Sequence, residues 1–460
     1  MIDFSKISHI WLVGIGGIGM SALARYFTAG GFNVGGYDRT ESPLTRELIS
    51  EGIMVIYRDK TGDIPLEYFN KENTLIIYTP AIPESNRILS YFRKEGFRVY
   101  KRSEVLGIIS DKSRTIAIAG THGKTSVTSI TAHLLKQSDI DCSAFLGGIS
   151  KNYMTNLLTG KGNIIVMEAD EFDRSFHYLK PEMALITSMD PDHLDVYGSY
   201  NNMVKAYGEF VGKIKNDGVL VLNDKIAGSF DKAGNTKIYT YGLSPSSDFH
   251  SSDISLERGA YRFSVHTPQT IIDDLTLLTP GKMNIENSVG AIALAVLAGV
   301  SDNDIRKALL YYKGVLRRFD VRISSDKITY IDDYAHHPEE LNYCIDSVRE
   351  FYGDRKVTGI FQPHLYTRTR DHAEAFAAAL DKLDRAILLP VYPAREEPIE
   401  GVNTGIIYDR MKLKDKSLAE KENIPGLLEK LKNDIVLTLG AGDIDRLVEP
   451  IENIIKKQLG

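Results

Sequence analysis

Cysteine is nearly absent from this 460-residue sequence, which contains only Cys142 and Cys344. Two thiols so far apart exclude a disulfide framework of the kind that stabilises small secreted domains, and they favour a reducing compartment, the cytoplasm. An excess of positive charge is also missing, because 55 Lys and Arg residues face 61 Asp and Glu residues and the formal net charge is -6. We therefore expect no nucleic-acid or membrane partner, and any anion must be bound at a local site.

Long hydrophobic runs are missing as well. The apolar segment HIWLV at 9–13 is followed at once by several glycines and has no basic leader before it. This pattern excludes a signal peptide and a transmembrane helix, and it predicts a buried strand. Short repeats and low-complexity tracts are also absent, and 43% hydrophobic with 25% charged residues is typical of a globular chain of several domains.

Short apolar runs alternate with helical patterns along nearly the whole chain, which predicts an α/β fold with parallel sheets covered by helices on both faces. We expect three domains: a Rossmann-like N-terminal domain at 1–108, a central P-loop ATPase-like domain at 109–315 and a Rossmann-like C-terminal domain at 316–460. The expected strands are IWLV, FNVGGYD, TLIIYTPAI, FRVY, TIAIA, NIIVM, MALITSM, KITYI, VTGIF, AILLP and IVLTL, with an irregular β region at about 240–280.

The first candidate phosphate loop is VGIGGIGMS at 13–21, whose glycines have the G-x-G-x-x-G spacing. It follows a predicted strand and opens a predicted helix, and Asp38 follows the next strand. Backbone N–H groups and the helix dipole at such a turn hold a pyrophosphate. NAD, FAD and a UDP-sugar all supply one, so this motif alone leaves a nicotinamide-dependent oxidoreductase as one hypothesis.

The second candidate loop is AGTHGKT at 119–125, again between a strand and a helix. It is a shortened P-loop, because Ile118 stands where the longer motif has its first glycine. We expect its backbone amides to cradle phosphates, Lys124 to neutralise the β and γ oxygens, and the Thr125 hydroxyl to bind Mg²⁺. An oxidoreductase has no use for such a loop, so this motif argues against that hypothesis.

Two acidic loops follow strands of the same predicted sheet, EADE at 168–171 and DPDHLD at 190–195. Ligands of an open parallel sheet collect at the carboxyl ends of its strands, so Glu168 and His193 are candidate metal ligands facing Thr125. A zinc site is not expected, because the adjacent His336 and His337 cannot both face one ion and no C-x-x-C or H-x-x-x-H is present.

Together these motifs resemble the Mur ligases, the ATP-dependent amide-forming enzymes of peptidoglycan precursor synthesis. The resemblance runs in order through GIGGIGMS at 14–21, GTHGKTS at 120–126, EADEFDRSF at 168–176, DPDHLDVYG at 190–198, NIENSVGAIALA at 284–295, GVLRRFD at 314–320, DDYAHHPEE at 332–340, FQPHLYTRTRD at 361–371 and GAGDI at 440–444.

Within the family, the sequence most resembles the members that add L-alanine to UDP-N-acetylmuramate. The member that reattaches a recycled tripeptide to the same sugar is the alternative, but it typically has a longer segment after its EADE-like motif than the one from Glu168 to Pro181 here. A nucleotide-binding regulator without catalysis is a third hypothesis, against which the intact Lys124, Glu168 and His193 argue. The resemblance implies ATP, Mg²⁺, UDP-N-acetylmuramate and L-alanine as ligands, and a monomer or homodimer.

The resemblance also implies site residues. The UDP-substrate would contact Gly16, Gly17, Ile18, Gly19, Asp38, Thr79, Ala81, His193 and Arg368. ATP would contact Gly120, Thr121, His122, Gly123, Lys124, Thr125, Ser126, Asn284, Asn287, Arg318, Asp333, Tyr334 and His336. Catalysis would involve Lys124, Glu168, His193, His364 and Arg368, and Mg²⁺ would bind Thr125, Glu168 and His193. Lys205 is either a support for a second metal or an exposed helix lysine.

The sequence departs from the family pattern at two positions. The arginine of the P-H-R-Y-T-R segment is Leu365 here, and we expect Arg370 to supply the missing carboxylate contact. The histidine of the G-x-H-N segment is Met283, which concerns local packing rather than ATP binding.

Overall fold

The computed structural model describes residues 2–172, 174–191, 194–230, 235–257, 259–394, 396–429 and 434–459. Its contacts divide the chain into two compact units, each of which is described by itself. The first comprises Met1–Ile254, Phe263–Thr276 and Glu286–Tyr312, and the second comprises Ser255–Arg262, Leu277–Ile285 and Lys313–Gly460.

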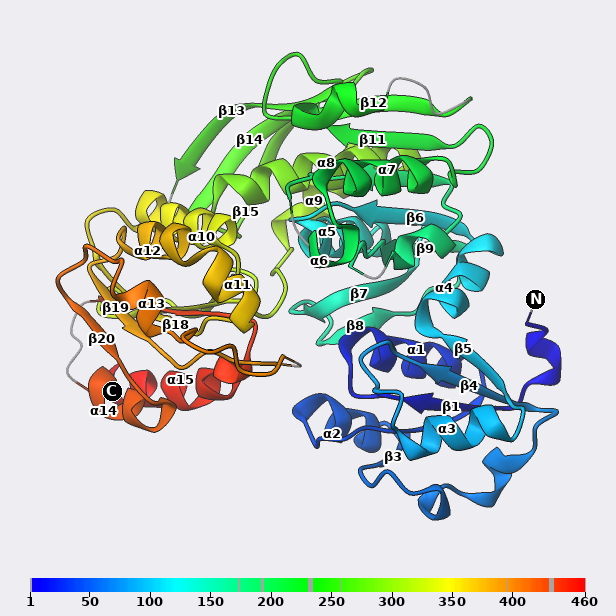
Figure 1. Cartoon of the computed structure of the whole chain (residues 1–460). Helices are drawn as coiled ribbons and strands as arrows, with labels where there is room; N and C mark the ends of the chain where they lie inside the picture. The colour runs from blue at the N-terminus through cyan, green and yellow to red at the C-terminus, as the bar shows by residue number, and fades with distance from the viewer. Residues whose placement is uncertain are drawn as a thin grey trace. The chain divides into compact units, whose positions relative to one another are not determined.

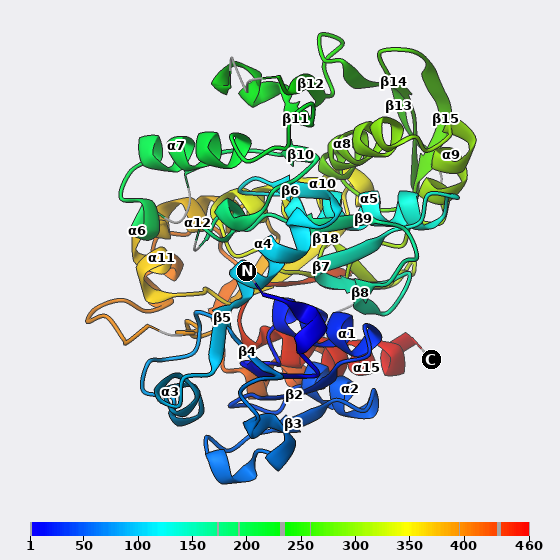
Figure 2. The ribbon, with the colours of Figure 1, turned by 90° about the vertical axis from the view of Figure 1, so that its right-hand side faces the viewer.

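The first unit begins with a five-stranded parallel sheet in the order β3-β2-β1-β4-β5. Its strands are β1 (His9–Val13), β2 (Asn33–Tyr37), β3 (Met54–Ile56), β4 (Thr74–Tyr78) and β5 (Arg98–Lys101). Because neighbouring side chains of a strand point to opposite faces, Leu12 packs in one core with α1 (Ile18–Ala29) and α2 (Pro43–Ser50), and Trp11 packs in another with α3 (Arg87–Lys94). Figure 2 shows α2 and α3 on opposite sides of this sheet.

A ten-stranded sheet follows, in the order β15-β14-β13-β12-β11-β10-β6-β9-β7-β8. Its strands are β6 (Arg114–Ala119), β7 (Ser143–Ser150), β8 (Thr155–Leu158), β9 (Ile164–Glu168), β10 (Met183–Ile186), β11 (Val219–Asn223), β12 (Lys237–Gly242), β13 (Phe249–Glu257), β14 (Ala260–His266) and β15 (Ile271–Leu277). The helices of this part of the chain are α4 (Arg102–Asp111), α5 (Lys124–Lys136), α6 (Leu194–Tyr197), α7 (Tyr200–Val211), α8 (Lys282–Ala298) and α9 (Asp302–Leu310). Tyr207 and Phe210 of α7 share one core with Leu220 and Leu222 of the sheet, and the apolar face predicted for α5 is buried.

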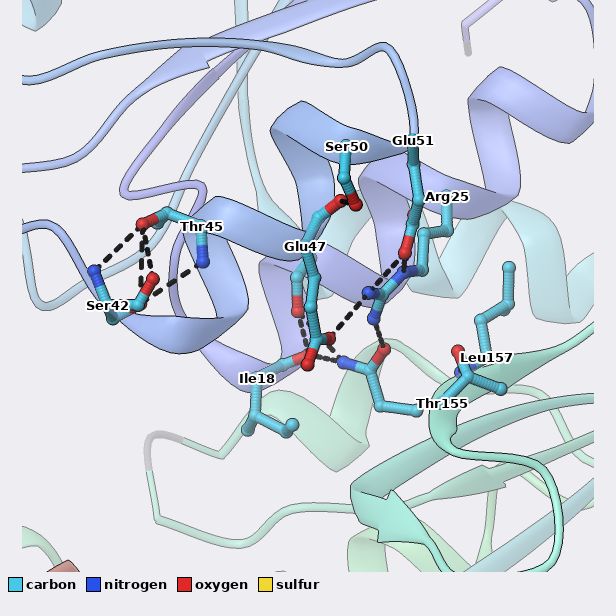
Figure 3. A network of polar contacts seen from close by, with 11 residues as sticks. Ile18, Arg25, Ser42, Thr45, Glu47, Ser50, Glu51, Thr155 and Leu157 are labelled. Carbon is cyan, nitrogen blue, oxygen red and sulfur yellow. Dashed lines mark hydrogen bonds and ion pairs between the residues drawn. The ribbon is translucent and has the colours of Figure 1, made fainter. Parts of the chain in front are cut away.

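Helix α1 joins the two sheets of the first unit, since it packs on β2 and also on β7 and β8 (Figure 1). Its Arg25, only 8% exposed, forms ion pairs with Glu47 of α2 and with Glu51, which follows that helix (Figure 3). The Arg25 guanidinium also donates to the Asn156 side chain on β8, whose amide donates to the Ile18 carbonyl at 2.6 Å. Buried polar groups are costly unless paired, so this network fixes α1 against β8.

The second unit is built on a six-stranded sheet in the order β16-β17-β21-β18-β19-β20. Its strands are β16 (Asp320–Ile323), β17 (Thr329–Asp333), β18 (Lys356–Phe361), β19 (Arg385–Leu388), β20 (Lys416–Leu418) and β21 (Asp434–Leu439). One face packs on α10 (Pro338–Tyr352), α12 (Ala373–Leu380) and α13 (Gly405–Tyr408), and the other on α14 (Ile424–Leu428) and α15 (Val448–Leu459). The short α11 (Tyr366–Asp371) follows β18.

The α/β fold predicted from the sequence is confirmed, and each apolar run named as a strand lies on a strand of these sheets. Six strands, β3, β7, β8, β11, β16 and β20, were not predicted from the sequence, and two of the pairs are antiparallel, β7 with β8 and β16 with β17. Of these, β3, β8, β16 and β20 are short strands at sheet edges, whereas β7 and β11 lie inside the ten-stranded sheet. The domain boundaries at 108 and 315 stay predictions. Among the described helices, none combines the length and apolar character needed to cross a membrane.

Candidate active site

The glycine loop connects β1 to α1, and two predicted residues from other parts of the chain, Asp38 and Thr79, lie against it. Gly14 has φ +90°, a left-handed conformation that favours glycine, and a Cβ there would lie 2.5 Å from Cγ2 of Thr79. The Gly16 N–H donates to Oδ2 of Asp38 at 2.8 Å. Gly17 and Ile18 are exposed at the start of α1, so the helix N-terminus is open to an anion. Ala81 is exposed on the loop that follows Thr79.

The P-loop runs from β6 into α5 and is held by the segment after β10. The Thr121 N–H donates to the Ser188 carbonyl at 3.1 Å, and the His122 N–H donates to Ser188 Oγ at 3.1 Å. The Thr187 hydroxyl donates to the His122 carbonyl, and Gly120 has φ +126° with no room for a Cβ beside Thr187. Sequence reasoning missed Thr187 and Ser188 as positioning residues, although their place directly after a predicted strand was a usable signal.

Lys124 begins α5 with its ammonium group fully hydrogen-bonded. Nζ donates to the carbonyls of Gly120 at 2.5 Å and Thr121 at 3.3 Å, and it forms an ion pair with Glu171 at 2.9 Å. The side chains of Lys124 and Glu171 are 16% and 2% exposed. A phosphate can therefore reach Lys124 only by displacing one of these partners, since an ammonium has three donors.

The charges around this pair shift both pKa values. Burial alone would lower the pKa of Lys124, but the carboxylates of Glu171, Asp170 and Glu168 outweigh it and raise that pKa. Burial raises the pKa of Glu171 to about 7, against the opposing attraction of Lys124. The sequence had singled out Glu168 as the functional carboxylate of this motif, but the structure pairs Glu171 with the lysine.

These shifts predict a pH dependence of ATP affinity. Below about pH 7 Glu171 is protonated and its ionic hold on Lys124 is lost, so phosphate oxygens compete better for the ammonium. We expect the Kd for ATP to rise several-fold between pH 6 and pH 8, and Glu171→Gln to bind ATP at pH 8 about as tightly as the unchanged protein does at pH 6. The Kd is measured by calorimetry on both proteins at each pH, because the protonation of ATP itself affects both equally. If the Kd of the unchanged protein and the Kd of Glu171→Gln depend on pH in the same way, the prediction is contradicted.

Glu168 ends β9 and contacts β7. Its Oε1 accepts the N–H of Gly147 at 2.8 Å, and a Cβ at Gly147 would collide with this carboxylate. Thr125 is buried in the first turn of α5. His193, the third predicted metal ligand, lies outside the described residues. Within the described part of the chain, no group of three or more His, Cys, Asp or Glu side chains could hold a metal ion.

Asn287 of α8 packs directly against the P-loop. It is 5% exposed, its Nδ2 has no hydrogen-bond partner among the described residues, and a Cβ at Gly123 would lie 2.8 Å from its Oδ1. An unpaired amide at this depth is costly, and an incoming nucleotide would satisfy it. Asn284, in the second unit, instead donates to the Pro280 carbonyl at 2.6 Å, and the neighbouring Met283 is half-buried. Lys205 is an exposed residue of α7.

The second unit holds the two arginines of the RRF turn around Tyr334. Arg317 donates to Oδ2 of the buried Asp332 at 3.1 Å and to the Gly440 carbonyl at 2.6 Å. Arg318 is 34% exposed, stacks its guanidinium 5.0 Å from the Tyr334 ring centre and lies 4.0 Å from Glu340. Arg317, 21% exposed, thus binds a buried carboxylate, and Arg318 is the more exposed of the two.

Asp333 is a structural anchor in this geometry. Its two carboxylate oxygens accept the N–H groups of Phe319 at 2.6 Å and Ala335 at 2.7 Å. Burial raises its pKa to about 6, against the attraction of Arg318. Both oxygens thus bind the backbone of the neighbouring residues, and the predicted ATP contact of Asp333 stays a prediction.

A histidine cluster gathers beside α11. His336 lies 5.7 Å from His364 between ring centres, and His364 stacks on Tyr392 at 5.8 Å. Arg368 Nη1 donates to Nδ1 of His364 at 3.4 Å. Burial lowers the pKa of His336, against the attraction of Glu340, so its ring favours the neutral form. The structure therefore brings His336, predicted at the ATP site, together with His364 and Arg368, predicted at the catalytic site.

The substitute expected for the missing arginine is placed differently. Arg370 is exposed and forms an ion pair with its neighbour Asp371 at 2.7 Å. Leu365 precedes α11 with φ +72°, an uncommon backbone for a branched side chain, and its N–H donates to the Tyr392 carbonyl at 2.9 Å. In this structure Arg370 contacts no residue of the histidine cluster that is described, so the replacement of the arginine by Arg370 stays a prediction.

Comparison with known proteins identifies the family of this chain. It is 50% identical over 459 residues to the UDP-N-acetylmuramate–L-alanine ligase of Parabacteroides distasonis, covering 100% of this chain and 99% of the relative. This chain belongs to the Mur ligase family. Three segments of this Mur ligase match family descriptions: "Mur ligase family, catalytic domain" at 9–114, "Mur ligase middle domain" at 118–295 and "Mur ligase, glutamate ligase domain" at 317–442.

Further similarities of this Mur ligase extend over its full length. The UDP-N-acetylmuramate–L-alanine ligase of Porphyromonas gingivalis is 46% identical, with 98% of this chain and 99% of the relative covered. The crystal structure of the UDP-N-acetylmuramate-alanine ligase of Thermotoga maritima aligns with a TM-score of 0.82 at 27% identity, covering 98% of this chain and 99% of the other. The fold and the order of the domains are therefore those of a Mur ligase.

Proposed function

We propose that this Mur ligase joins L-alanine to the muramate carboxylate of UDP-N-acetylmuramate and converts ATP to ADP and phosphate. The observation that carries the proposal is the presence in one compact unit of two strand–loop–helix anion sites, the glycine loop with Asp38 and the P-loop with Lys124. Only a reaction with two phosphate-bearing substrates uses both. Relatives named for this activity match the chain from end to end.

The first chemical step forms an acyl phosphate. A muramate carboxylate oxygen bonds to the γ-phosphorus of ATP while the bond from that phosphorus to the β–γ bridging oxygen breaks, and ADP leaves with that electron pair. Lys124 exchanges Glu171 for phosphate oxygens and offsets the negative charge that accumulates on them. Thr187 and Ser188 hold the P-loop backbone at Thr121 and His122 and thereby position the rest of the loop, including Lys124, for the nucleotide.

The second step forms the amide. The neutral amine of alanine attacks the acyl carbon, the bond from that carbon to the phosphate oxygen breaks, and phosphate leaves as the amine gives up a proton. His364 and Arg368 would hold the carboxylate of alanine, because a guanidinium matches the geometry of a carboxylate. The lowered pKa of the half-buried His336 favours a neutral ring beside them.

Magnesium fits the donors on the P-loop side of the site. Oxygen ligands suit Mg²⁺. Thr125 would supply a hydroxyl from the first turn of α5 and Glu168 a carboxylate from the end of β9, with His193 as the third proposed ligand. When bound, the ion would neutralise phosphate charge and align the γ-phosphoryl group. The unpaired amide of Asn287 against Gly123 provides a further contact for the nucleotide.

The tripeptide-recycling ligase remains the alternative within the family, since its ATP chemistry is the same and only the incoming amine differs. An assay of phosphate release with ATP, Mg²⁺ and UDP-N-acetylmuramate separates the two if L-alanine, glycine, L-serine and the stem tripeptide are compared as acceptors. We expect release that depends on L-alanine. Dependence on the tripeptide would assign recycling, and no release with any acceptor would indicate a nucleotide-binding regulator.

A further inference from the structure

Arg102 begins α4, on the segment that connects the first sheet to the P-loop strand. Its guanidinium lies against the first turn of α1, because a Cβ at Gly19 would collide with Nη1 of Arg102 and lie 3.1 Å from its Cζ. Gly19 is not one of the glycines with a left-handed φ. A side chain at position 19 would therefore displace the Arg102 guanidinium, whereas the backbone conformation of Gly19 does not itself demand glycine.

The cation at this place is held loosely. Arg102 Nη2 lies 3.8 Å from Oδ2 of Asp170, beyond hydrogen-bond distance, and the two side chains are 22% and 41% exposed. No hydrogen bond from the Arg102 guanidinium to another part of the described chain is present. An arginine next to Asp170 with its donors unused is ready to bind a stronger anion.

The electrostatics of α1 indicate where that anion sits. The N-terminus of a helix carries partial positive charge and disfavours a nearby cation. Arg102 nevertheless lies over the first turn of α1, beside the exposed Gly17 and Ile18. Two positive groups that face each other across an open loop are stabilised when an anion lies between them.

We propose that Arg102 binds the diphosphate of the UDP-substrate and exchanges Asp170 for its phosphate oxygens. This inference rests on the proposed function, which places the UDP-substrate at the glycine loop. Arginine suits the exchange because its planar fork bonds two phosphate oxygens at once. Asp170 then acts as a placeholder that positions the guanidinium while the loop is empty.

Calorimetric titration with UDP and with uridine tests the proposal on the full-length protein. Charge-assisted hydrogen bonds of this kind are worth roughly ten- to a hundredfold in affinity, so we expect Arg102→Met to weaken UDP binding by about that factor and to leave uridine binding unchanged. Arg102→Lys should be intermediate, because lysine keeps the charge but loses the fork. Asp170→Asn should bind UDP at least as tightly as the unchanged protein, because the competing carboxylate is gone.

The controls separate the possible failures. Arg98 is an exposed arginine on β5, and Arg98→Ala should leave UDP affinity unchanged. An unchanged affinity of Arg102→Met for ATP should show that this variant is folded. Unchanged UDP affinity in Arg102→Met, or an equal loss of uridine affinity, would overturn the role of Arg102 and leave the proposed function intact. If the protein without any substitution binds no UDP, the proposed function is overturned and this inference with it.

Discussion

Replacing Lys124 by methionine is expected to lower kcat for alanine-dependent phosphate release by roughly a thousandfold. The ammonium is the one side-chain cation bonded to the P-loop backbone, through the carbonyls of Gly120 and Thr121, among the described residues. Its loss leaves the negative charge of the transferring phosphoryl group without this partner, because P-loop catalysis consists mostly of positioning and charge stabilisation. The measurement is the steady-state rate at saturating ATP.

Matched variants separate this effect from unfolding. Methionine at 124 leaves Glu171 buried without its cation, but the carboxyl group, whose pKa is already about 7, can take up a proton. The double variant Lys124→Met, Glu171→Gln should therefore be as inactive as the single variant and no less stable. Lys136→Met, at the other end of α5, removes a lysine paired with Asp141 and should keep its activity. More than a tenth of the rate remaining in Lys124→Met would contradict the assignment.

Replacing Arg317 by methionine is expected to lower the free energy of unfolding of the second unit by about 3–5 kcal/mol. The guanidinium is the cation for Asp332, which is fully buried and also accepts the Thr438 hydroxyl at 2.6 Å. Without Arg317 that carboxylate stays in the core with no counter-charge, and the Gly440 carbonyl loses its donor. The result is a strong loss of stability without any direct contact to substrate.

The measurement must follow the second unit. The only tryptophan, Trp11, lies in β1 of the first unit, so its fluorescence reports on the wrong part of the chain. Hydrogen exchange of the β17 and β21 amides, measured at increasing urea concentrations, reports on the second unit directly. Arg318→Met, which removes the neighbouring and more exposed arginine, should cost less than about 1 kcal/mol. Equal costs for the two variants would contradict the core role of Arg317.

The glycine loop and the P-loop were predictable from the sequence because local rules define them. A buried strand, glycines at fixed spacing and a helix with apolar residues on one face all occur within about fifteen residues, and each requires the others. The contacts of Gly16 with Asp38 and of Gly14 with Thr79 follow from the parallel order of the first sheet. The sequence therefore placed these residues at one edge.

Partners far apart in the chain were not predictable. Which carboxylate of EADE meets Lys124 depends on how the loop turns after β9, and the structure selects Glu171 through burial beside Tyr197, whose hydroxyl donates to the Glu171 carbonyl at 2.6 Å. Arg317 and Arg318 are adjacent, and the left-handed backbone at Arg317 decides which of them faces the core. The approach of Arg102 to Gly19 joins residues on different elements, with no sequence signal.

The claim that one reaction uses both phosphate loops is tested most directly by isotope transfer. UDP-N-acetylmuramate with ¹⁸O in both oxygens of its muramate carboxylate is incubated with ATP, Mg²⁺ and L-alanine, and the phosphate released is analysed by mass spectrometry. We expect one ¹⁸O atom in each phosphate, because the carboxylate oxygen that attacks the γ-phosphorus leaves with it. Unlabelled phosphate formed together with the amide product would contradict the acyl-phosphate route and the assignment of the two loops to a single transfer.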